Sequence, residues 1–516
     1  MTYTFADHAP EPWAHQRKGF DLSKDREYFA LFMEQRTGKS RVIIDTAAYA
    51  YERGFIDGVL LLAPNGVHRN WITEGFGQFL PRRIPAALAT WRTGLMDTKK
   101  AQEQLTAALG HDGLTVLSMN YDALNTVKAK AYLGKFLRKR KLMVVGDESD
   151  DLSTPGAKRT QTAIRAAKYG IMRRILTGTP AAEDPFGLYA QTNFLKMFVL
   201  GYTSFLAFKH RFGEWEEGYN GRTDTTFETL KRSDDGAPCY RNLDELQRKL
   251  DAFSFRVTRV ECGGQLPTLV TRPFELHETQ RRLYNHLREE YVAELQDGTV
   301  TAAMVLVRYA RLQQITSGFV PLDRHPQPCP HCAGTDPDCS VCFGLGVVLP
   351  DGGISTLPNP RLDALEREVR GASGATVVWT RFIHDADAVM GKLRAMGRRP
   401  GRYDGTVKEN EREQVKLAFQ RGDLSDIVAN PQAGGRGLDF SRARTTIFYS
   451  HHWSLRLRLQ AQDRIETLKH NLPSMNIDLV ADDTVDEIIT QCHRDKRAVQ
   501  DVITNDRERI YGRKIT

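Results

Sequence analysis

The sequence predicts an α/β protein with two parallel-sheet domains, helical insertions and a small zinc-binding insertion. Three observations carry this prediction. Short apolar runs alternate with helical stretches in residues 1–185, the same alternation returns in residues 359–490, and the region between them contains helical patterns and a cysteine cluster. Strands that alternate with helices indicate a parallel sheet covered by helices. A chain of 516 residues is also too long for one compact domain.

The first domain is expected at residues 1–185, where apolar runs end in a turn or in polar residues. These runs are YFALFM, GVLLLAP, LTVLSMNY, KLMVVGDE and RRILTGTP, and the first is followed by a helical stretch, SRVIIDTAAYAYERG. In parallel sheets, ligands bind at the carboxyl ends of the strands. The polar residues after each run are therefore the candidates for a functional site.

The remainder of the chain divides into four expected segments. Residues 186–300 are interpreted as a helical insertion and 301–358 as a linker with a zinc-binding insertion. Residues 359–490 form the second α/β domain, with GATVVWTRF, DIVANP and TTIFYS as strand candidates. Residues 491–516 are expected to form a basic C-terminal helix.

Charge and hydropathy limit the choice of partners. The formal net charge is +8 and the pI about 9.0, a mild excess that permits a nucleic-acid partner. The chain has no apolar run of the roughly 18 residues that a membrane helix needs. The first residues, MTYTFADHAPEPW, also lack the basic and apolar regions of a secretory signal. We therefore expect a cytoplasmic protein with no membrane partner.

Residues 32–42, FMEQRTGKSRV, predict a phosphate-binding loop between a strand and a helix. Such a loop uses backbone N–H groups at a helix N-terminus, a lysine for the β- and γ-phosphates and a hydroxyl for Mg²⁺. Gly38, Lys39 and Ser40 supply these parts, although Met33 stands where the full pattern has its first glycine. A chance triplet is the alternative interpretation, but the strand before it and the helix after it favour ATP and Mg²⁺.

Two adjacent carboxylates follow another apolar run, KLMVVGDESD. Asp147 would hold Mg²⁺ through water, and Glu148 would polarise the attacking water. Alone, the two acids would be interpreted as a solvated strand end. Together with Lys39 they fit the two halves of a site that hydrolyses a nucleoside triphosphate.

Four of the seven cysteines fall in the run CPHCAGTDPDCSVC. The CxxC-x6-CxxC spacing favours one tetrahedral, structural Zn²⁺ site, with four free surface thiols as the alternative. The other three cysteines are scattered singly, which suits a reducing compartment. The expected zinc ligands are Cys329, Cys332, Cys339 and Cys342.

The order of the motifs resembles that of the superfamily 2 ATPases, and within them the Swi/Snf group of double-stranded DNA translocases. PWAHQRKGF resembles the adenine-reading Q motif, LLAPNGVHRNW motif Ia, LSMNYDAL motif Ib, DESD motif II, LTGTP motif III, VVWTRF motif IV, NPQAGGRGLDF motif V and LQAQDRIETLKH motif VI. The resemblance covers nearly the whole chain. It implies two RecA-like domains that close on ATP and move along duplex DNA.

The resemblance also assigns roles to single residues. Gln16 would read the adenine, and Arg464 would act as the arginine finger from the second domain. Asp147 and Ser40 would hold Mg²⁺. The expected catalytic residues are Lys39, Asp147, Glu148, Gln460 and Arg464. The expected nucleotide-binding residues are Gln16, Thr37, Gly38, Lys39, Ser40, Gly437 and Asp439.

Two positions depart from the pattern of this group. Arg36 stands where the group usually has glycine, so a residue with a Cβ must fit the loop without a positive φ or with strain. We expect its side chain to point away from the phosphates. Thr467 stands where motif VI usually has a second arginine, and Arg436 or Lys469 could compensate for the missing charge.

The sequence therefore predicts an ATP-dependent translocase or remodeller of double-stranded or branched DNA, acting as a monomer with an unidentified recruiting protein. Two alternatives stay open. The first is a helicase or branched-DNA remodeller, which would need a wedge that splits strands. The second is a nucleotide-switched DNA-binding clamp with little turnover, which Arg36 and Thr467 keep open.

Overall fold

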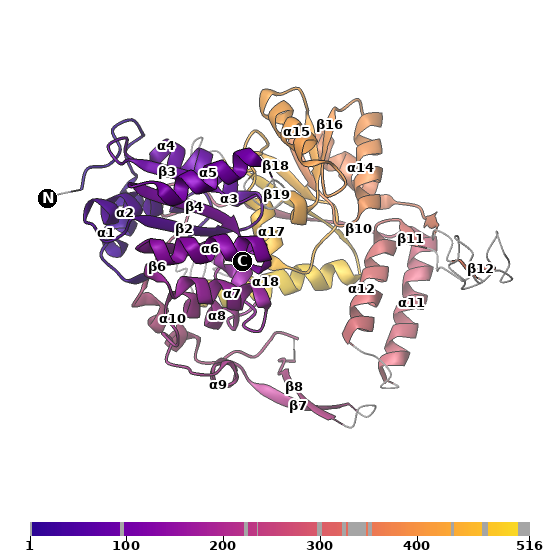
Figure 1. Cartoon of the computed structure of the whole chain (residues 1–516). Helices are drawn as coiled ribbons and strands as arrows, with labels where there is room; N and C mark the ends of the chain where they lie inside the picture. Colours follow the sequence, from indigo (N-terminus) through magenta and orange to yellow (C-terminus); the bar gives the residue numbers. More distant parts are fainter. Residues whose placement is uncertain are drawn as a thin grey trace.

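The computed structural model describes residues 3–92, 98–220, 225–234, 236–296, 302–321, 327–328, 347–348, 353–434, 438–466 and 473–503. The described chain forms two lobes that lie side by side, each built on a parallel sheet (Figure 1). Lobe 1 contains the first sheet and the phosphate-loop motif, and lobe 2 contains the second sheet. This arrangement confirms the predicted α/β fold class of two parallel-sheet domains.

Lobe 1 is built on a seven-stranded sheet in the order β3-β4-β2-β5-β6-β1-β9. Neighbouring strands are parallel throughout, and the central ones are mostly apolar because both faces of the sheet are covered. The strands are β1 (Tyr28–Met33), β2 (Gly58–Ala63), β3 (Ala86–Thr90), β4 (Leu114–Asn120), β5 (Leu142–Asp147), β6 (Gly170–Leu176) and β9 (Ser254–Val257).

Each face of this sheet has its own hydrophobic core, because successive side chains of a strand point to opposite faces. In β1, Ala30 and Phe32 belong to one core, and Leu31 and Met33 to the other. The helices and helical turns of lobe 1 are α1 (Ala14–Ser23), α2 (Lys39–Glu52), α3 (Val67–Asn70), η1 (Trp71–Phe76), α4 (Gly77–Phe79), α5 (Lys99–Gly110), η3 (Asp122–Asn125), α6 (Val127–Lys139), η4 (Ser149–Leu152), α7 (Lys158–Ala167) and α8 (Gly187–Leu195).

Lobe 2 is built on a six-stranded parallel sheet in the order β10-β19-β18-β15-β17-β16. Its strands are β10 (Thr268–Phe274), β15 (Thr376–Trp379), β16 (Pro400–Tyr403), β17 (Asp426–Ala429), β18 (Thr445–Phe448) and β19 (Met475–Ala481). Its helices are α13 (Pro360–Gly371), α14 (Ile383–Ala395), α15 (Glu409–Arg421), α16 (Pro431–Gly434), α17 (Leu455–Gln462) and α18 (Val485–Ile503).

The segment 186–300, expected to be helical, contains strands as well. Its β9 pairs with β1 in lobe 1, and its β10 pairs with β19 in lobe 2, so the segment contributes an edge strand to each sheet. The domain boundaries expected at residues 185 and 300 therefore do not follow the sheets. The remaining elements of this part of the sequence are α9 (Phe205–Phe212), the hairpin of β7 (Trp215–Asn220) and β8 (Thr225–Leu230), α10 (Leu243–Asp251), α11 (Glu278–Gln296) and α12 (Ala302–Thr316).

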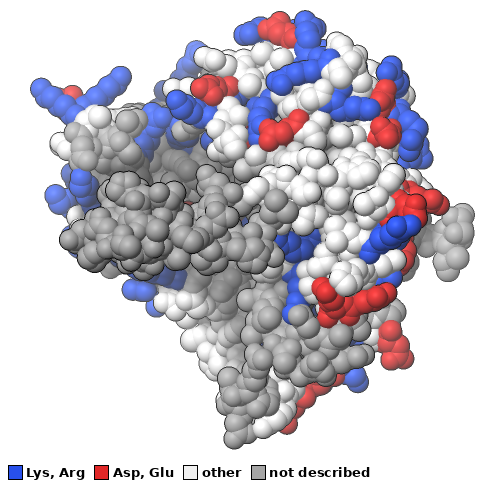
Figure 2. Space-filling view, turned by 90° about the vertical axis from the view of Figure 1, so that its right-hand side faces the viewer, with Lys and Arg blue, Asp and Glu red and all other residues white. Residues whose placement is uncertain are grey.

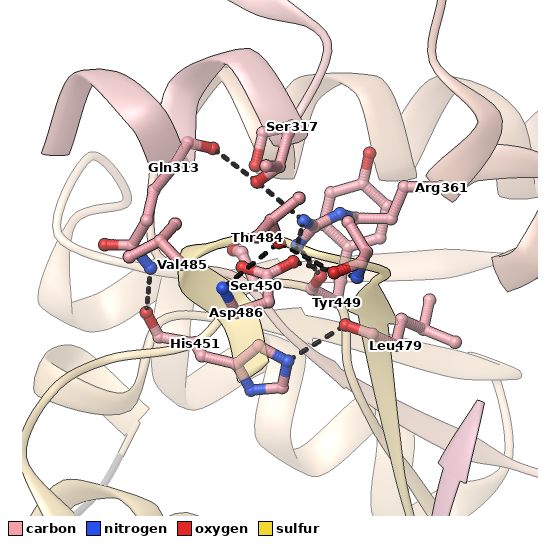
Figure 3. Close-up of polar contacts among 12 residues, drawn as sticks. Gln313, Ser317, Arg361, Tyr449, Ser450, His451, Leu479, Thr484, Val485 and Asp486 are labelled. Carbon is pink, nitrogen blue, oxygen red and sulfur yellow. Dashed lines mark hydrogen bonds and ion pairs between the residues drawn. The ribbon is translucent and has the colours of Figure 1, made fainter. Parts of the chain in front are cut away.

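Helices α11 and α12 form a hairpin that projects from lobe 2 (Figure 1). A buried polar cluster anchors its second helix (Figure 3). Gln313 at the end of α12 donates through Nε2 to the carbonyl of His451, at 2.9 Å. Arg361 is fully buried, donates to Thr316 Oγ1 at 2.8 Å and pairs with Asp486 at the start of α18. The hairpin is thus tied to the carboxyl end of the lobe 2 sheet.

Several expected residues lie outside the described residues. They are the four cysteines Cys329, Cys332, Cys339 and Cys342, and the motif V and VI residues Arg436, Gly437, Thr467 and Lys469. Two short antiparallel pairs flank the cysteine region: β11 (Phe319–Pro321) with β14 (Ile354–Thr356), and β12 (Gln327–Pro328) with β13 (Val347–Val348). The expected C-terminal helix is α18, which begins before residue 491, at Val485.

A membrane span needs a helix that is both long and apolar. None of the helices in the described ranges is both long enough and apolar enough to cross a bilayer. The cytoplasmic location stays a prediction.

Candidate functional site: the nucleotide cleft between the lobes

The phosphate-binding loop connects β1 to α2 at the carboxyl edge of the lobe 1 sheet. Gly38 is the N-terminal cap of α2 and has a φ of 89°, a conformation that glycine adopts without steric cost. A Cβ added at Gly38 would lie 2.1 Å from Nε2 of Gln16, so only glycine fits there. The first N–H groups of α2, which have no partner within the helix, begin at this point, as anion binding requires.

Lys39 is buried at the first position of α2. Its ammonium group donates to the carbonyl oxygens of Met33, at 2.8 Å, and Glu34, at 3.4 Å. These contacts hold the lysine across the beginning of the loop. Ser40, the expected Mg²⁺ ligand, follows it in α2 and is partly buried.

Asp147 ends the buried strand β5, beside the loop. Nε1 of Trp71 donates to its Oδ2 at 2.7 Å, and the backbone N–H of Glu148 donates to its Oδ1 at 3.0 Å. Burial, and then the negative charge of Glu148, raises the pKa of Asp147 to about 7, although the charge of Lys39 opposes the shift. A bound Mg²⁺ would favour the ionised form of this carboxyl group.

One carboxylate oxygen of Glu148 accepts a hydrogen bond, and the other has no hydrogen-bond partner in the part of the chain that the structure describes. Nε2 of Gln35 donates to its Oε1 at 2.6 Å, whereas its Oε2 is buried with no hydrogen-bond partner among the described residues. Its backbone is left-handed, with a φ of 48°. An unpaired buried carboxylate oxygen is costly, and a water molecule in the cleft would satisfy it. The geometry therefore suits an acceptor that polarises water.

Gln16, the expected adenine reader, contacts the loop directly. Its Oε1 accepts the backbone N–H of Trp13 at 3.0 Å, and its Nε2 donates to the carbonyl of Thr37 at 3.1 Å. Nε2 of His15 lies 2.7 Å from the same carbonyl. In the structure, helix α1 thus supports the loop through two side chains. Contact of Gln16 with adenine stays a prediction.

Lobe 2 faces this loop with α17 and the turn that follows it. Arg456 and Gln460 are one helical turn apart and share a face of α17. Arg456 pairs with Asp151 of lobe 1 at 2.6 Å. Gln460 is buried, and neither its amide oxygen nor its amide nitrogen has a hydrogen-bond partner in the described ranges. A polar ligand in the cleft would satisfy both atoms.

Arg464 is buried just after α17. Its Nε donates to the carbonyl of Gln460 at 2.9 Å, and its Nη1 to the carbonyl of Leu438 at 3.2 Å. Burial, and then the positive charge of Arg36, lowers the pKa of Arg464 to about 10, while Glu148 acts in the opposite direction. The expected arginine finger and the expected water-polarising carboxylate therefore interact across the lobes.

Arg36 crosses from the phosphate loop to lobe 2. Its Nη1 donates to Oδ1 of Asp439 at 3.1 Å, and its Nη2 donates to the carbonyls of Leu438, at 3.1 Å, and Arg464, at 2.9 Å. Its φ is 65°, so the loop takes the strained alternative for a residue with a Cβ. Burial acts to raise the pKa of Asp439, but the charge of Arg36 and hydrogen bonds from Ser441 outweigh it, and the pKa is lowered.

Motif reasoning missed four residues that touch the predicted site. They are His15, Gln35, Trp71 and Arg456. Gln35 lies within residues 32–42, the predicted phosphate-binding loop, so its position could have marked it as a site residue. Trp71 and Arg456 act on Asp147 and Asp151 through long-range contacts, for which a single sequence contains no local pattern.

Two cavities lie between the lobes. The first, of about 540 Å³, is lined on the lobe 1 side by Glu34 and Gln35 and on the lobe 2 side by Leu459 and Asp463. Its volume is in the range of small-molecule sites. The second, of about 740 Å³, is lined by polar residues from motifs Ia and Ib and from α15 and α16. Its basic residues are Arg69, Arg159, Arg412, Lys416 and Arg456.

Comparison with known proteins finds a family match to part of lobe 2 and relatives along most of the chain. Residues 360–466 match the helicase conserved C-terminal domain. The ATP-dependent helicase brm of Drosophila melanogaster is 24% identical over 471 residues, which are 90% of this chain and 27% of that protein. The probable ATP-dependent DNA helicase CHR12 of Arabidopsis thaliana is 24% identical over 473 residues, which are 90% of this chain and 39% of that protein. The chain thus spans well under half the length of these two relatives.

A relative closer in size comes from a phage. Protein p41 of Acyrthosiphon pisum secondary endosymbiont phage 1 is 23% identical over 411 residues, which are 77% of this chain and 78% of that protein. The solved SWI2/SNF2 ATPase core of Sulfolobus solfataricus in complex with dsDNA aligns with 97% of this chain at 18% identity. Its TM-score of 0.39 is too low to establish a shared lobe arrangement. The helicase C-terminal match over residues 360–466, the similarity to brm and CHR12 over nine tenths of the chain and the order of the motifs together support a Swi/Snf-like ATPase of superfamily 2.

Proposed function

We propose that this protein is a DNA-dependent ATP hydrolase that moves along double-stranded DNA. The observation that carries the proposal is the meeting of two halves of a site in one cleft. Lobe 1 contributes the phosphate loop and the Asp147–Glu148 pair, and lobe 2 contributes Gln460 and Arg464. A phosphate loop, a carboxylate pair and an arginine from a second domain are the parts that phosphoryl transfer to water uses.

Each side chain of the cleft has a definite task in this proposal. ATP with Mg²⁺ would supply the phosphoanhydride bond and the cation that neutralises developing charge. Lys39 and the N-terminus of α2 bind the phosphates. Asp147, whose Oδ2 accepts from Trp71, would hold the Mg²⁺, and Gln35 holds Oε1 of Glu148 so that Oε2 would be placed to accept a hydrogen bond from the attacking water. Arg464 adds positive charge from lobe 2.

The 740 Å³ cavity is the proposed DNA contact. Basic side chains enter it from both lobes, with Arg69 and Arg159 from lobe 1 and Arg412 and Lys416 from lobe 2. Such side chains bind phosphates without reading sequence. A strand held by both lobes would be displaced whenever the cleft opens and closes. Movement along DNA follows if the two grips alternate in strength.

The surface charge supports a contact in the cleft rather than over a whole face. Figure 2 shows Lys and Arg side chains over the upper part of one face, with Asp and Glu side chains among them. The described part of that face therefore does not present a field of a single sign. The 740 Å³ cavity gathers five basic side chains together with the acidic Asp122, Asp151 and Glu413, and its basic side chains are the candidates for the grip on phosphates.

The test of this function is ATP turnover with different DNAs. We expect double-stranded DNA to stimulate hydrolysis several-fold more than single-stranded DNA at equal nucleotide concentration. Displacement of a triplex-forming strand should accompany hydrolysis, which would show movement along the duplex. Unwinding of a forked duplex would instead favour the helicase alternative. ATP binding without turnover on any DNA would favour the nucleotide-switched clamp.

We also propose that the cysteine segment holds one structural Zn²⁺ through Cys329, Cys332, Cys339 and Cys342. The CxxC-x6-CxxC pattern supports this. The pairing of Gln327 with Val348 and of Pro328 with Val347 also supports it, because it closes the segment at its base. Elemental analysis of protein purified without chelator should find about one zinc per chain. Metal-free protein with four reactive thiols would contradict the site.

The setting of the activity is proposed from the sequence and one relative. Similarity over most of the length of a phage protein supports action in the cytoplasm of a bacterial or phage-infected cell. Action as a monomer and recruitment by another protein stay predictions.

A further inference from the structure

We infer that Arg36 is a positioning residue that joins the phosphate loop to lobe 2 before nucleotide binds, and so sets the place of Arg464. The effect on turnover rests on the proposed ATPase function, but the contact itself does not. No pattern of the phosphate loop calls for an arginine at this position, where the local backbone favours glycine. The structure shows what the side chain does instead.

The guanidinium of Arg36 meets three acceptors from two segments of lobe 2. Asp439 Oδ1 and the carbonyl of Leu438 belong to motif V, and the carbonyl of Arg464 belongs to motif VI. All three distances are between 2.9 and 3.1 Å. A planar group with five N–H donors suits several acceptors at once, which a lysine ammonium on a flexible stem does not match.

The contacts continue from Arg36 to Arg464. The carbonyl of Leu438 accepts from Arg36 and also from Nη1 of Arg464, at 3.1 and 3.2 Å. The carbonyl of Arg464 accepts from Arg36 and also from the backbone N–H of Phe440, at 2.9 Å each. Both ends of Arg464, its side chain and its backbone, are thus held in a network to which Arg36 belongs.

The backbone of Arg36 has a strained conformation, which indicates that the contacts of its side chain offset the cost of that strain. A φ of 65° in a residue with a Cβ persists only where the surroundings impose it. Gly38, two residues on, also has a positive φ, and there the close approach of Gln16 requires a glycine. At position 36 a glycine would relieve the backbone but lose all three side-chain contacts.

A second contact between the lobes provides a comparison. Arg456 pairs with Asp151 at 2.6 Å, so it also joins the lobes, but its described ion-pair partners, Asp150 and Asp151, lie in η4 rather than in the phosphate loop. If any bond between the lobes served equally, losing either contact would have the same effect on the loop. The proposal requires that only Arg36 controls the segment from Leu438 to Ser441.

The first test uses hydrogen exchange in the nucleotide-free, full-length protein. Two amides report on the network: Phe440 donates to the carbonyl of Arg464, and Ser441 donates to Oδ1 of Asp439. In Arg36→Ala we expect exchange of the peptide that contains them to accelerate about tenfold or more, since local opening frees both amides. Arg456→Ala, and Arg165→Ala on the exposed face of α7, should leave it within twofold of the wild type. Unchanged exchange in Arg36→Ala would overturn the inference.

The second test separates positioning from general damage. Arg36→Ala should lower the kcat of DNA-stimulated hydrolysis about tenfold, while the affinity for a fluorescent ATP analogue stays within threefold. Arg36→Lys should recover part of kcat. The losses of kcat in Asp439→Ala and Arg36→Ala should be less than additive when the two changes are combined, because both remove the contact between Arg36 and Asp439. Equal losses of kcat and affinity, or fully additive losses, would count against positioning. If the wild-type protein does not hydrolyse ATP, the proposed function fails, and hydrogen exchange still decides the role of Arg36.

Discussion

Asp147 links the stability of the protein to pH. Burial and the charge of Glu148 raise its pKa from an ordinary 3.8 to about 7. Between these values the folded protein binds more protons than the unfolded chain. This group therefore makes the free energy of unfolding fall as pH rises from about 4 to about 7. Mg²⁺ needs the ionised form, so its binding should strengthen over the upper part of that range.

We therefore expect Asp147→Asn to stabilise the nucleotide-free protein at pH 8 by at least about 1 kcal/mol, and to have less effect at pH 5. The amide cannot ionise, so it avoids the cost of a buried charge. Urea unfolding at the two pH values measures the effect. Asp122→Asn, an exposed change, is the control. A stabilisation that does not depend on pH would contradict the assigned pKa.

Glu148→Gln should keep nucleotide binding and lose turnover. Removal of a group that accepts a proton or a hydrogen bond from the attacking water typically costs about 10²–10⁴-fold in rate. Steady-state hydrolysis with duplex DNA and binding of an ATP analogue give the two quantities. Glu103→Gln on the exposed face of α5 is the matched control. Hydrolysis within threefold of the wild type would remove Glu148 from the mechanism.

The sequence could predict those single residues whose chemistry is written in a short motif. Lys39, Asp147 and Glu148 follow strands that the apolar pattern shows, and the structure places them at the carboxyl ends of β1 and β5, which are separated by β6 in the sheet. Trp71 and Arg456 could not be predicted, because their partners are 76 and 305 residues away. The contacts of the Arg36 side chain with lobe 2 could not be predicted either, because the loop pattern does not indicate which lobe 2 residues the side chain reaches.

Among the strands, the strength of the apolar pattern decides which of them the sequence can predict. The central strands β1, β2, β4, β5 and β6 are apolar runs that the sequence shows plainly. By contrast, β3 has the sequence AALAT, with alanines that favour strands weakly, and β9 has only four residues, SFRV. Both are edge strands, and their pairing is decided by the sheet they join rather than by their own sequence.

The buried polar cluster that anchors the α11–α12 hairpin allows a prediction for Arg361 on α13. Arg361 is fully buried beside Asp486, so its removal leaves an unpaired buried carboxylate. We expect Arg361→Ala to lower the free energy of unfolding by about 3–5 kcal/mol. Arg370→Ala on the same helix breaks an exposed pair with Glu366 and should cost no more than about 1 kcal/mol. Chemical denaturation of both variants measures this.

A double replacement sharpens the interpretation of this anchor. Arg361→Met with Asp486→Leu removes both charges and keeps similar volume. It should recover a large part of the stability that Arg361→Ala loses, because buried pairs are often replaceable by apolar side chains. Failure of the double variant to exceed the single one would show that the hydrogen bonds to Thr316 and Tyr449 matter more than the charge pair.

For the whole molecule, contacts between the lobes decide how the site is assembled. Ion pairs join Arg36 to Asp439, Arg259 to Asp463, Arg456 to Asp151, and Lys496 to Glu183. Each pairs residues more than 200 positions apart, so no local pattern could indicate them. The motif order predicted two lobes, and the site residues that it indicates stay predictions. It could not predict how the lobes face each other, because that depends on side chains outside the motifs.

The cavity lined by basic residues of both lobes provides the last prediction. Lys416 lies on α15 and lines the 740 Å³ cavity with Arg412. If this cavity holds a DNA phosphate, Lys416→Ala should raise the duplex concentration for half-maximal ATPase stimulation several-fold. It should also reduce the slope of log affinity against log salt by about one, since one fewer counterion is released. Lys99→Ala removes an exposed lysine of lobe 1 and controls for net charge. An unchanged salt slope in Lys416→Ala, or equal losses in both variants, would move the DNA contact away from this cavity and leave only a general attraction between a basic protein and DNA.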